Sequence, residues 1–278
     1  MTYEVRLGRP DDHQGIRAFT TDTFEWGDYV ADAFLGWLDD PAIEVLVAVH
    51  DEDGPVAVAT LRRPGPGQAW MAAARVRSDH RRKGLANRLN DAGVALARER
   101  GDRIVRLAIE DWNEAPQRQV EQLGYRPTSR WWFVREPVEA ADRLPARDRL
   151  EPVAASEEIW PVWQRSAYAS AGRGLAGVHW TWWTLAPADL DGFARDGHLL
   201  GCPAGWAMVE PLEERLAVSW MCSADDDFVR LVEACRDLAR EHGLPMVSFN
   251  VPDDESLLGR LGGERSSVRI WELVLRDR

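Results

Sequence analysis

Short runs of hydrophobic residues that alternate with polar ones recur along the first half of the chain, and this period-two pattern is typical of strands. In the clearest case, Val105, Leu107 and Ile109 alternate with polar or small residues, and the run ends in the carboxylate of Glu110. Two earlier runs flank Asp51-Glu52-Asp53-Gly54, which has the residues of a hairpin turn. The predicted strands cover residues 3–7, 43–49, 56–61, 70–76, 105–109 and 131–135.

A long amphipathic helix is predicted after the strand at residues 70–76. Apolar residues recur there three and four positions apart, so they would form one face of a helix that begins near Lys83 or Gly84. These residues are Leu85, Leu89, Ala92 and Leu96. A polar turn at residues 77–82 joins the strand to the helix.

This turn has the chemistry of a phosphate site. The first turn of a helix leaves backbone N–H groups unpaired and carries about half a positive charge. Gly84 would let a large anion approach the backbone. Arg81, Arg82 and Lys83 add positive charge beside it. The alternative is an ordinary turn between a strand and a helix, with a solvated basic tip.

The order of these motifs resembles the acetyl-CoA-binding core of the GCN5-related N-acetyltransferase (GNAT) family. The family's R-x-x-G-x-A pattern is met at Arg81–Ala86, before a long helix that ends at Gly101. Asn113-Glu114-Ala115 and Leu123-Gly124-Tyr125 then follow in the order of the family's next motifs. The resemblance covers residues 1–137. It implies a catalytic domain that uses acetyl-CoA and needs no metal.

The resemblance also implies which residues hold the co-substrate. The backbone of Arg75 and Val76 would pair with the pantetheine arm and orient the thioester carbonyl, and Asn113 would lie beside the arm. The residues expected to hold the pyrophosphate are Arg81, Arg82, Lys83, Gly84, Leu85 and Ala86.

Two departures from the family pattern bear on catalysis. Val120 stands where many relatives carry a tyrosine that protonates the departing thiolate, and Met71–Ala74 lacks the glutamate that often takes a proton from the acceptor. A positioned acid or base contributes about a hundred- to ten-thousandfold, so its loss slows transfer without abolishing it. Base duty is predicted for Glu110 or Asp111 at the end of the next strand, or for Glu25. Glu110 is the preferred candidate, and a solvated strand end is the alternative for it.

Residues 20–40 mix aromatic side chains with carboxylates, and the resemblance implies that they form one wall of the acceptor groove. Such a wall suits an amine, which it would hold by charge and cation–π contacts. Glu25 and Asp28 are the candidates for these contacts. The residues that spacing places in the core instead are Phe34, Trp37 and Leu38.

The chain changes character after residue 137. Residues 138–152 are charged and punctuated by prolines, which is typical of a linker. Residues 153–278 then repeat the order of elements of the first half. Helices are expected at residues 156–168, 187–195, 225–242 and 255–261, and strands at residues 199–200, 205–209, 216–221, 246–251 and 268–275.

The repeat predicts an α/β (α+β) fold with two tandem GNAT-like domains, each a central, mostly antiparallel mixed sheet flanked by helices. The phosphate cradle does not recur, because Ser223 to Asp227 take its place and three carboxylates would repel a pyrophosphate. The second domain is therefore predicted to be degenerate and not to bind acetyl-CoA. Its tryptophans either complete the acceptor pocket or fill its own core. These are Trp180, Trp182, Trp183, Trp206 and Trp220.

Composition narrows the possible partners. A length of 278 residues suits two domains, and 45% hydrophobic residues supply a core for each. The net charge of -12 argues against a nucleic-acid partner and favours a cationic acceptor, unless it serves only solubility. No apolar run could span a membrane and no signal peptide is recognisable, so a soluble cytoplasmic protein is expected. The cysteines lack metal-ligand spacing and are expected to be unreactive thiols: Cys202, Cys222 and Cys235.

The sequence thus predicts an N-acetyltransferase that moves an acetyl group from acetyl-CoA to a primary amine of a small molecule, by direct attack in a ternary complex. Two alternatives stay open. One is an enzyme that acetylates a protein amine, and the other is a non-catalytic module that binds acetyl-CoA.

Overall fold

The computed structural model describes residues 2–21, 27–138, 148–155, 157–224 and 227–276. Contacts between residues group the chain into two compact units. The first unit comprises Met1–Leu107, Arg118–Arg126 and Glu272–Arg278, and the second comprises Ala108–Gln117 and Pro127–Trp271. Within the described parts of the chain, no helix is both long and apolar enough to cross a membrane.

The first unit is built on a mixed sheet. Its first four strands are antiparallel neighbours in chain order, and the fifth joins the fourth in parallel. These strands are β1 (Tyr3–Leu7), β2 (Ile43–His50), β3 (Gly54–Gly65), β4 (Gln68–Val76) and β5 (Ile104–Glu110), of which residues 108–110 group with the second unit. The hairpin predicted between β2 and β3 is present, and Gly54 has the positive φ of 69° that such a turn requires.

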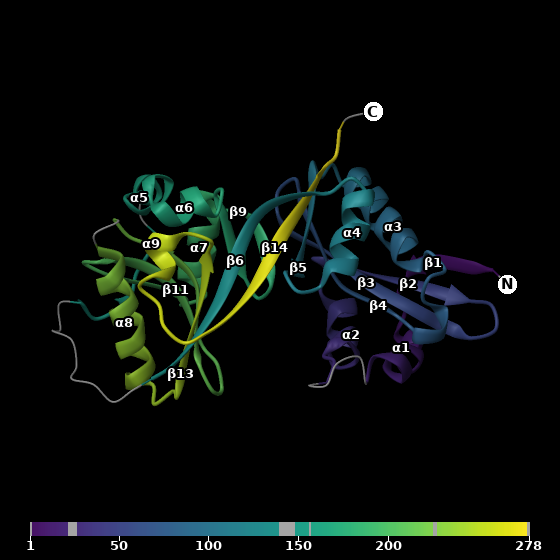
Figure 1. Cartoon of the computed structure of the whole chain (residues 1–278), viewed down its shortest axis with the longest axis horizontal. Helices are drawn as coiled ribbons and strands as arrows, with labels where there is room; N and C mark the ends of the chain where they lie inside the picture. The colour runs from purple at the N-terminus through teal and green to yellow at the C-terminus, as the bar shows by residue number, and fades with distance from the viewer. Residues whose placement is uncertain (1, 22–26, 139–147, 156, 225–226, 277–278) are drawn as a thin grey trace. The chain divides into compact units, whose positions relative to one another are not determined.

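Helices cover both faces of this sheet. Figure 1 shows α3 (Leu85–Glu99) on one side of β2–β4, with α1 (His13–Thr20) and α2 (Val30–Asp39) on the other. Phe34 is fully buried and Trp37 and Leu38 pack against its cluster, so these three residues belong to the core as predicted. The remaining helical segments are η1 (Pro10–Asp12), η2 (Ser78–His80) and α4 (Glu114–Gln122).

The second unit holds a sheet whose strand order is β14-β6-β13-β12-β11-β10-β7. Its strands are β6 (Arg126–Pro137), β7 (Glu151–Pro152), β10 (Leu199–Cys202), β11 (Gly205–Pro211), β12 (Leu216–Cys222), β13 (Met246–Pro252) and β14 (Glu264–Val274). A separate hairpin joins β8 (Leu175–Val178) and β9 (Thr181–Thr184). Its helices are α5 (Ile159–Arg165), α6 (Ala167–Ala171), α7 (Pro187–Arg195), α8 (Phe228–Glu241) and α9 (Glu255–Leu258).

The second unit repeats the plan of the first. In both, three antiparallel strands lead into a long helix and then into a strand that is parallel to the third. Thus β10, β11, β12, α8 and β13 correspond to β2, β3, β4, α3 and β5. The predicted α/β fold with two tandem copies of one core is therefore confirmed.

Three features of the second unit differ from the sequence-based expectation. The helix expected at residues 156–168 is two helices, because Ser166 has extended backbone and caps α6 by accepting a hydrogen bond from the Ala169 N–H at 3.1 Å. The hairpin of β8 and β9 was not expected. The last strand begins earlier than residue 268, and residues 272–278 group with the first unit although they end the chain.

An ion pair holds this last segment in the first unit. Arg106 of β5 is buried, and its Nε donates to Oε2 of Glu272 at 2.8 Å. Its Nη1 donates to Oε1 of Gln68 at 2.5 Å. The Leu275 N–H also donates to the Arg103 carbonyl at 2.7 Å. A buried guanidinium is stable only with such partners, so the half-buried carboxylate of Glu272 stabilises the first unit.

We expect Glu272→Ala to lower the free energy of unfolding by about 3 kcal/mol, because it leaves the Arg106 guanidinium buried without its counter-charge. Glu264→Ala at the exposed start of the same strand is the matched control and should change stability by less than about 0.5 kcal/mol. Urea denaturation of both variants measures the difference. Equal stabilities would show that the C-terminal segment contributes little to the first unit.

Candidate acetyl-CoA site

The parallel strands β4 and β5 pair over only three positions. The register joins Gln68 to Ile104 and ends at Trp70 and Arg106. Beyond that point, Met71–Val76 pairs with β3 on one edge and with no other described strand. The backbone N–H and C=O groups on the other edge of β4 are therefore available to an extended ligand, because a strand presents such groups on both edges.

A bulge interrupts β4 along this open edge. Thr60 lies opposite Ala72 and Val58 lies opposite Arg75, so two steps on β3 match three steps on β4. Ala73 lies in the bulge with a φ of 55°, a left-handed conformation that is costly for a residue with a Cβ. The pattern of small residues in this strand gave no signal for the bulge. Strain of this kind is concentrated at binding sites, where it redirects backbone groups.

The side chain of Arg75 is held in place by Asp28. Its Nε donates to Oδ2 of Asp28 at 2.7 Å, and the side chain of Asp28 is fully buried. Asp28 also accepts from the Val30 N–H at 3.1 Å, and Arg75 lies 5.8 Å from the centre of the Tyr29 ring. Asp28 was an acceptor candidate, but its carboxylate is engaged by this arginine. The pair instead fixes the end of β4, where Arg75 and Val76 were expected to meet the pantetheine arm.

The predicted phosphate cradle opens α3. Gly84 is the N-cap residue, with a φ of 76°, and no side chain caps the first turn. A Cβ at this glycine would meet no atom within 4 Å, so the space above the helix start is open. Leu85 is buried and anchors the first turn, whereas Ala86 is half-buried. The N–H groups of this turn are thus held in place without a partner from the helix or from a cap.

Three basic side chains surround this helix start, and all are exposed. Arg81 donates from Nε to the Val76 carbonyl at 3.3 Å, which connects the cradle to the end of β4. Arg82 has a φ of 62°, which turns the chain into the helix at some cost in backbone energy. Among the described residues, neither Arg82 nor Lys83 has a side-chain partner.

A buried histidine, which sequence reasoning missed, supports the loop before the cradle. Nε2 of His80 lies 2.6 Å from Arg77 Nη2, and Nδ1 lies 3.0 Å from the Tyr3 hydroxyl. Because a guanidinium only donates, Nε2 accepts and Nδ1 carries the proton. Burial lowers the pKa of His80, and Arg77 and Lys83 lower it further. The signal available in the sequence was the position of His80, which directly precedes the basic residues of the cradle.

Glu110 and Asn113 lie close together at the turn after β5, where the Asn113 N–H donates to the Glu110 carbonyl at 3.0 Å. The carboxylate of Glu110 is half-buried and has no partner among the described residues. Asp111 differs, because its Oδ2 accepts from Arg130 at 2.5 Å and from Ser267 at 2.6 Å. Asp111 is therefore structural, whereas Glu110 has a carboxylate that is not engaged. Glu25 lies outside the described residues.

No tyrosine acid stands in the helix before the Leu123-Gly124-Tyr125 motif. Val120 of α4 is buried, as its apolar side chain predicts. The hydroxyl of Tyr125 is also buried and donates to Oδ1 of Asn90 at 2.9 Å. Burial, with a contribution from Asp91, raises the pKa of Tyr125 far above its usual value. Tyr125 is therefore a packing residue of the first unit.

In the second unit, the position of the cradle has different chemistry. Asp227 is the N-cap residue of α8 and its carboxylate pairs with Arg230 at 2.6 Å. The hydroxyl of Tyr168 donates to the Asn250 carbonyl of β13, directly after β12 and β13 stop pairing at Val218 and Phe249. A tyrosine thus engages β13, the strand that corresponds to β5, just beyond the paired positions. Asp225 and Asp226, which were predicted to repel phosphate, lie outside the described residues.

Most of the tryptophans of the second unit are in its core. Trp182 and Trp220 are fully buried, and Trp183 is 8% exposed. Trp220 lies 5.3 Å from Trp163, centre to centre. Trp180, at 49% exposure, presents a large surface, and it stacks on a phenylalanine of β6. The expectation that these residues fill the core of their own unit holds for the buried three.

Burial disfavours the thiolate form of all three cysteines. Burial raises the pKa of the Cys222 thiol to about 12 and also raises that of Cys235. Cys202 is half-buried, and its pKa is also raised by burial. Within the parts of the chain that the structure describes, no group of three or more His, Cys, Asp or Glu side chains is placed to hold a metal ion.

Comparison with solved structures shows that the fold of the whole chain is shared. A GCN5-related N-acetyltransferase from Sphaerobacter thermophilus has a TM-score of 0.65 at 15% identity, over 99% of this chain and 96% of that one. Another from Kribbella flavida has a TM-score of 0.59 at 13% identity, over 98% of this chain and 72% of that one. The glucosamine N-acetyltransferase region of a fungal multi-domain GH3 beta-N-acetylglucosaminidase has a TM-score of 0.73 at 13% identity. That match covers 98% of this chain and 38% of that one.

Sequence comparison finds a matching family model for part of the chain. No curated protein matches the chain. The model of the Acetyltransferase (GNAT) family matches residues 14–125, which include the open edge of β4 and the cradle at the start of α3. Residues 14–125 are therefore similar to the GNAT acetyltransferase family.

Proposed function

We propose that the chain is an acetyl-CoA-dependent N-acetyltransferase whose acceptor is a primary amine of a small molecule. The observation that carries this proposal is a surface of backbone groups in the first unit that no described strand pairs with and no side chain caps. It runs along the open edge of β4 and ends at the uncapped first turn of α3. A ligand that matches it has an extended amide-bearing arm and an anionic end, which is the chemistry of coenzyme A.

The residues of this surface have separate roles. Gly84, Leu85 and Ala86 offer backbone N–H groups to the pyrophosphate, while Arg82 and Lys83 supply charge. Arg81 adds further charge, and its side chain bonds to the Val76 carbonyl at the end of β4. Arg75 and Val76, next to the bulge, present backbone groups to the pantetheine and the thioester carbonyl. The carbonyl oxygen gains negative charge as the amine attacks, so a fixed N–H at that point stabilises the transition state.

Transfer needs little from acid–base groups. The amine nitrogen forms a bond to the thioester carbon, the ammonium proton goes to a base, and the C–S bond breaks to release the thiolate of coenzyme A. A thiolate leaves without a general acid, which is consistent with Val120. We assign the base to Glu110, since its carboxylate is not engaged while that of Asp111 is. Glu25 is the second candidate, and Asn113 is assigned to the arm of the co-substrate.

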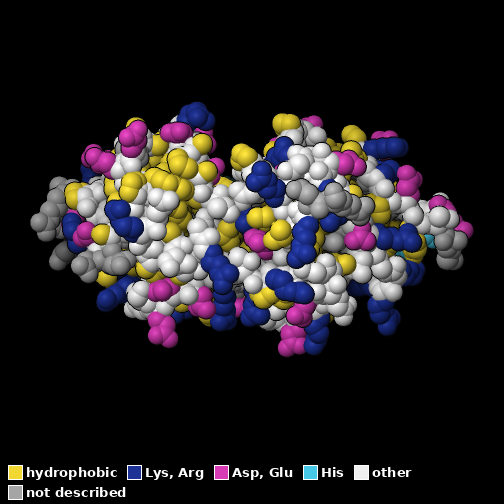
Figure 2. All heavy atoms as spheres, turned by 90° about the horizontal axis from the view of Figure 1, so that it is seen from above, with side chains coloured by type: hydrophobic (Ala, Val, Ile, Leu, Met, Phe, Trp, Pro, Cys, Tyr) yellow, Lys and Arg dark blue, Asp and Glu magenta, His cyan; other side chains and the backbone are white. Residues whose placement is uncertain are grey.

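Charge supports a small cationic acceptor. The chain has a net charge of -12, and on the face shown in Figure 2 the basic side chains are interspersed with acidic ones and form no continuous strip. Nucleic acid would need such a strip. A protein amine is the second candidate acceptor, and a binding module without transfer is the third. A panel of free amino acids, polyamines, glucosamine and lysine peptides distinguishes these three. Transfer to a small amine supports the first, transfer to the peptides alone supports the second, and no transfer supports the third.

Calorimetric titration with acetyl-CoA tests the cradle. We expect one equivalent to bind, and Gly84→Glu to weaken binding by more than about a hundredfold, because its carboxylate blocks and repels the pyrophosphate. Gly101→Glu at the other end of α3 is the matched control. It has nearly the same φ, 77°, and equally open space, so it carries the same strain and the same charge. Equal loss in both variants, or two equivalents in the wild type, would contradict the assignment.

Substitution of Glu110 tests the base. We expect Glu110→Gln to lower kcat for the best amine of the panel by about a hundred- to ten-thousandfold, with the acetyl-CoA affinity unchanged. Glu121→Gln on the exposed face of α4 is the control and should behave like the wild type. A full rate in Glu110→Gln together with a slow Glu25→Gln would move the role to Glu25.

The lowered pKa of His80 predicts how stability changes with pH. The folded protein holds this ring neutral, while the unfolded chain protonates it near its ordinary pKa of about 6.5. Its contribution to stability is therefore complete above that pH and is lost as the pH falls. We expect the stability difference between the wild type and His80→Gln to shrink between about pH 7.5 and pH 5.5. Urea denaturation at several pH values measures it, and parallel curves would exclude this role.

A further inference from the structure

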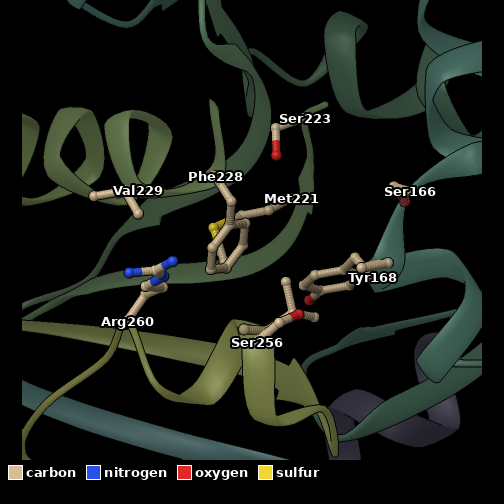
Figure 3. Close-up of a pocket in the computed structure, with 10 residues that line it drawn as sticks. Ser166, Tyr168, Met221, Ser223, Phe228, Val229, Ser256 and Arg260 are labelled. Carbon is tan, nitrogen blue, oxygen red and sulfur yellow. The ribbon is translucent and has the colours of Figure 1, made fainter. Parts of the chain in front are cut away.

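The second unit contains a pocket that the proposed reaction does not use. It has a volume of about 290 Å³, near the lower limit for small-molecule sites and large enough for about ten waters. It lies where β12 and α8 meet, which is the position that the cradle occupies in the first unit. Its walls come from α6, the end of β12, the start of α8, and α9 together with Arg260 (Figure 3).

Tyr168 lines the pocket near the point where the parallel strands of the second unit separate. Pairing of β12 with β13 stops at Val218 and Phe249, and the strands separate as β4 and β5 do. The Tyr168 ring enters from α6 and its hydroxyl donates to the Asn250 carbonyl. The exposed edge of β13 is thus engaged within the unit itself. A volume of about 290 Å³ suits a ligand far smaller than coenzyme A.

Apolar and polar groups line the pocket about equally, and several of the polar groups are already engaged. Met221, Phe228 and Leu257 are buried side chains that line it. Among its hydroxyls, Ser166 bonds to Trp163 and Ala169, and Ser256 bonds to Asp254. These hydroxyls therefore have partners already and add little to ligand recognition.

Two polar groups remain. Ser223 is buried at the end of β12, and Figure 3 shows its hydroxyl directed into the space between Phe228 and Tyr168. Arg260 lines the opposite side, and its guanidinium has no carboxylate partner among the described residues. A guanidinium matches a carboxylate in shape and charge, and it repels an amine.

From this arrangement we infer that the pocket binds a small monocarboxylate with an aliphatic or aromatic body. The body fills the space between Met221, Phe228 and Leu257, and the carboxylate pairs with Arg260 at the mouth. The Ser223 hydroxyl donates to a polar atom of the ligand deeper in the pocket. The site is separate from the proposed acetyl-transfer site, and its occupancy does not depend on whether that reaction takes place.

NMR of the full chain with methyl-labelled methionine tests this inference. The chain has five methionines, and Met221, which Met221→Leu identifies, is the one that lines the pocket. We expect phenylacetate and hexanoate to shift its methyl signal with a Kd on the order of 1 mM, while Met71 of β4 is unchanged. Phenylacetamide and phenethylamine should bind at least about tenfold more weakly, because they lack the negative charge.

Two substitutions locate the site. Arg260→Gln should weaken phenylacetate by about tenfold, whereas Arg195→Gln, at an exposed position of α7, should leave the affinity unchanged. Leu257→Trp should fill the pocket and abolish the Met221 shift, and unchanged Met208 and Met246 signals would report an intact fold. Three results would overturn the inference: no saturable shift with either acid, equal affinity for the amide, or a Met221 shift caused by acetyl-CoA.

Discussion

The early end of pairing between β4 and β5 is the constraint on which the first unit depends. Three paired positions hold the parallel strands together, and beyond them β4 keeps only β3 as a neighbour. Unpaired backbone groups are costly when they are buried, so this edge must face water or a ligand. The bulge at Ala73 and the uncapped start of α3 extend the same open surface. A site for an extended anionic ligand thus results from the backbone itself.

Because backbone groups form the surface, side chains act mainly by holding it in place. Arg75 is paired with buried Asp28 and fixes the end of β4. His80 links Arg77 to Tyr3 under the loop that precedes the cradle. The side chains of Arg75 and His80 can affect ligand binding without touching the ligand. Substitutions at such positions change affinity through geometry, and their effect resembles that of a misplaced backbone group.

The sequence predicted most of this architecture, since its signals are local. Leu85 and Leu89 mark the buried face of α3, and Gly84 marks the point where the chain turns into it. The features that it missed depend on distant contacts. The bulge at Ala73 lies in a run of alanines without a distinctive pattern, and the role of Asp28 depends on an arginine 47 positions away. The break at Ser166 was missed because the flanking residues suit one continuous helix.

The two copies of the core show how one geometry serves two purposes. Both copies separate a parallel strand pair and both place a long helix beside the gap. In the first copy, no described strand pairs with the exposed edge beyond Trp70, so a ligand can pair with it. In the second, the Tyr168 hydroxyl engages the other strand of the pair, β13, at Asn250, and the helix start carries Asp227 instead of a basic turn. The same gap therefore differs in its chemistry, and in the second copy it holds a small pocket of mixed lining with Arg260 among its walls.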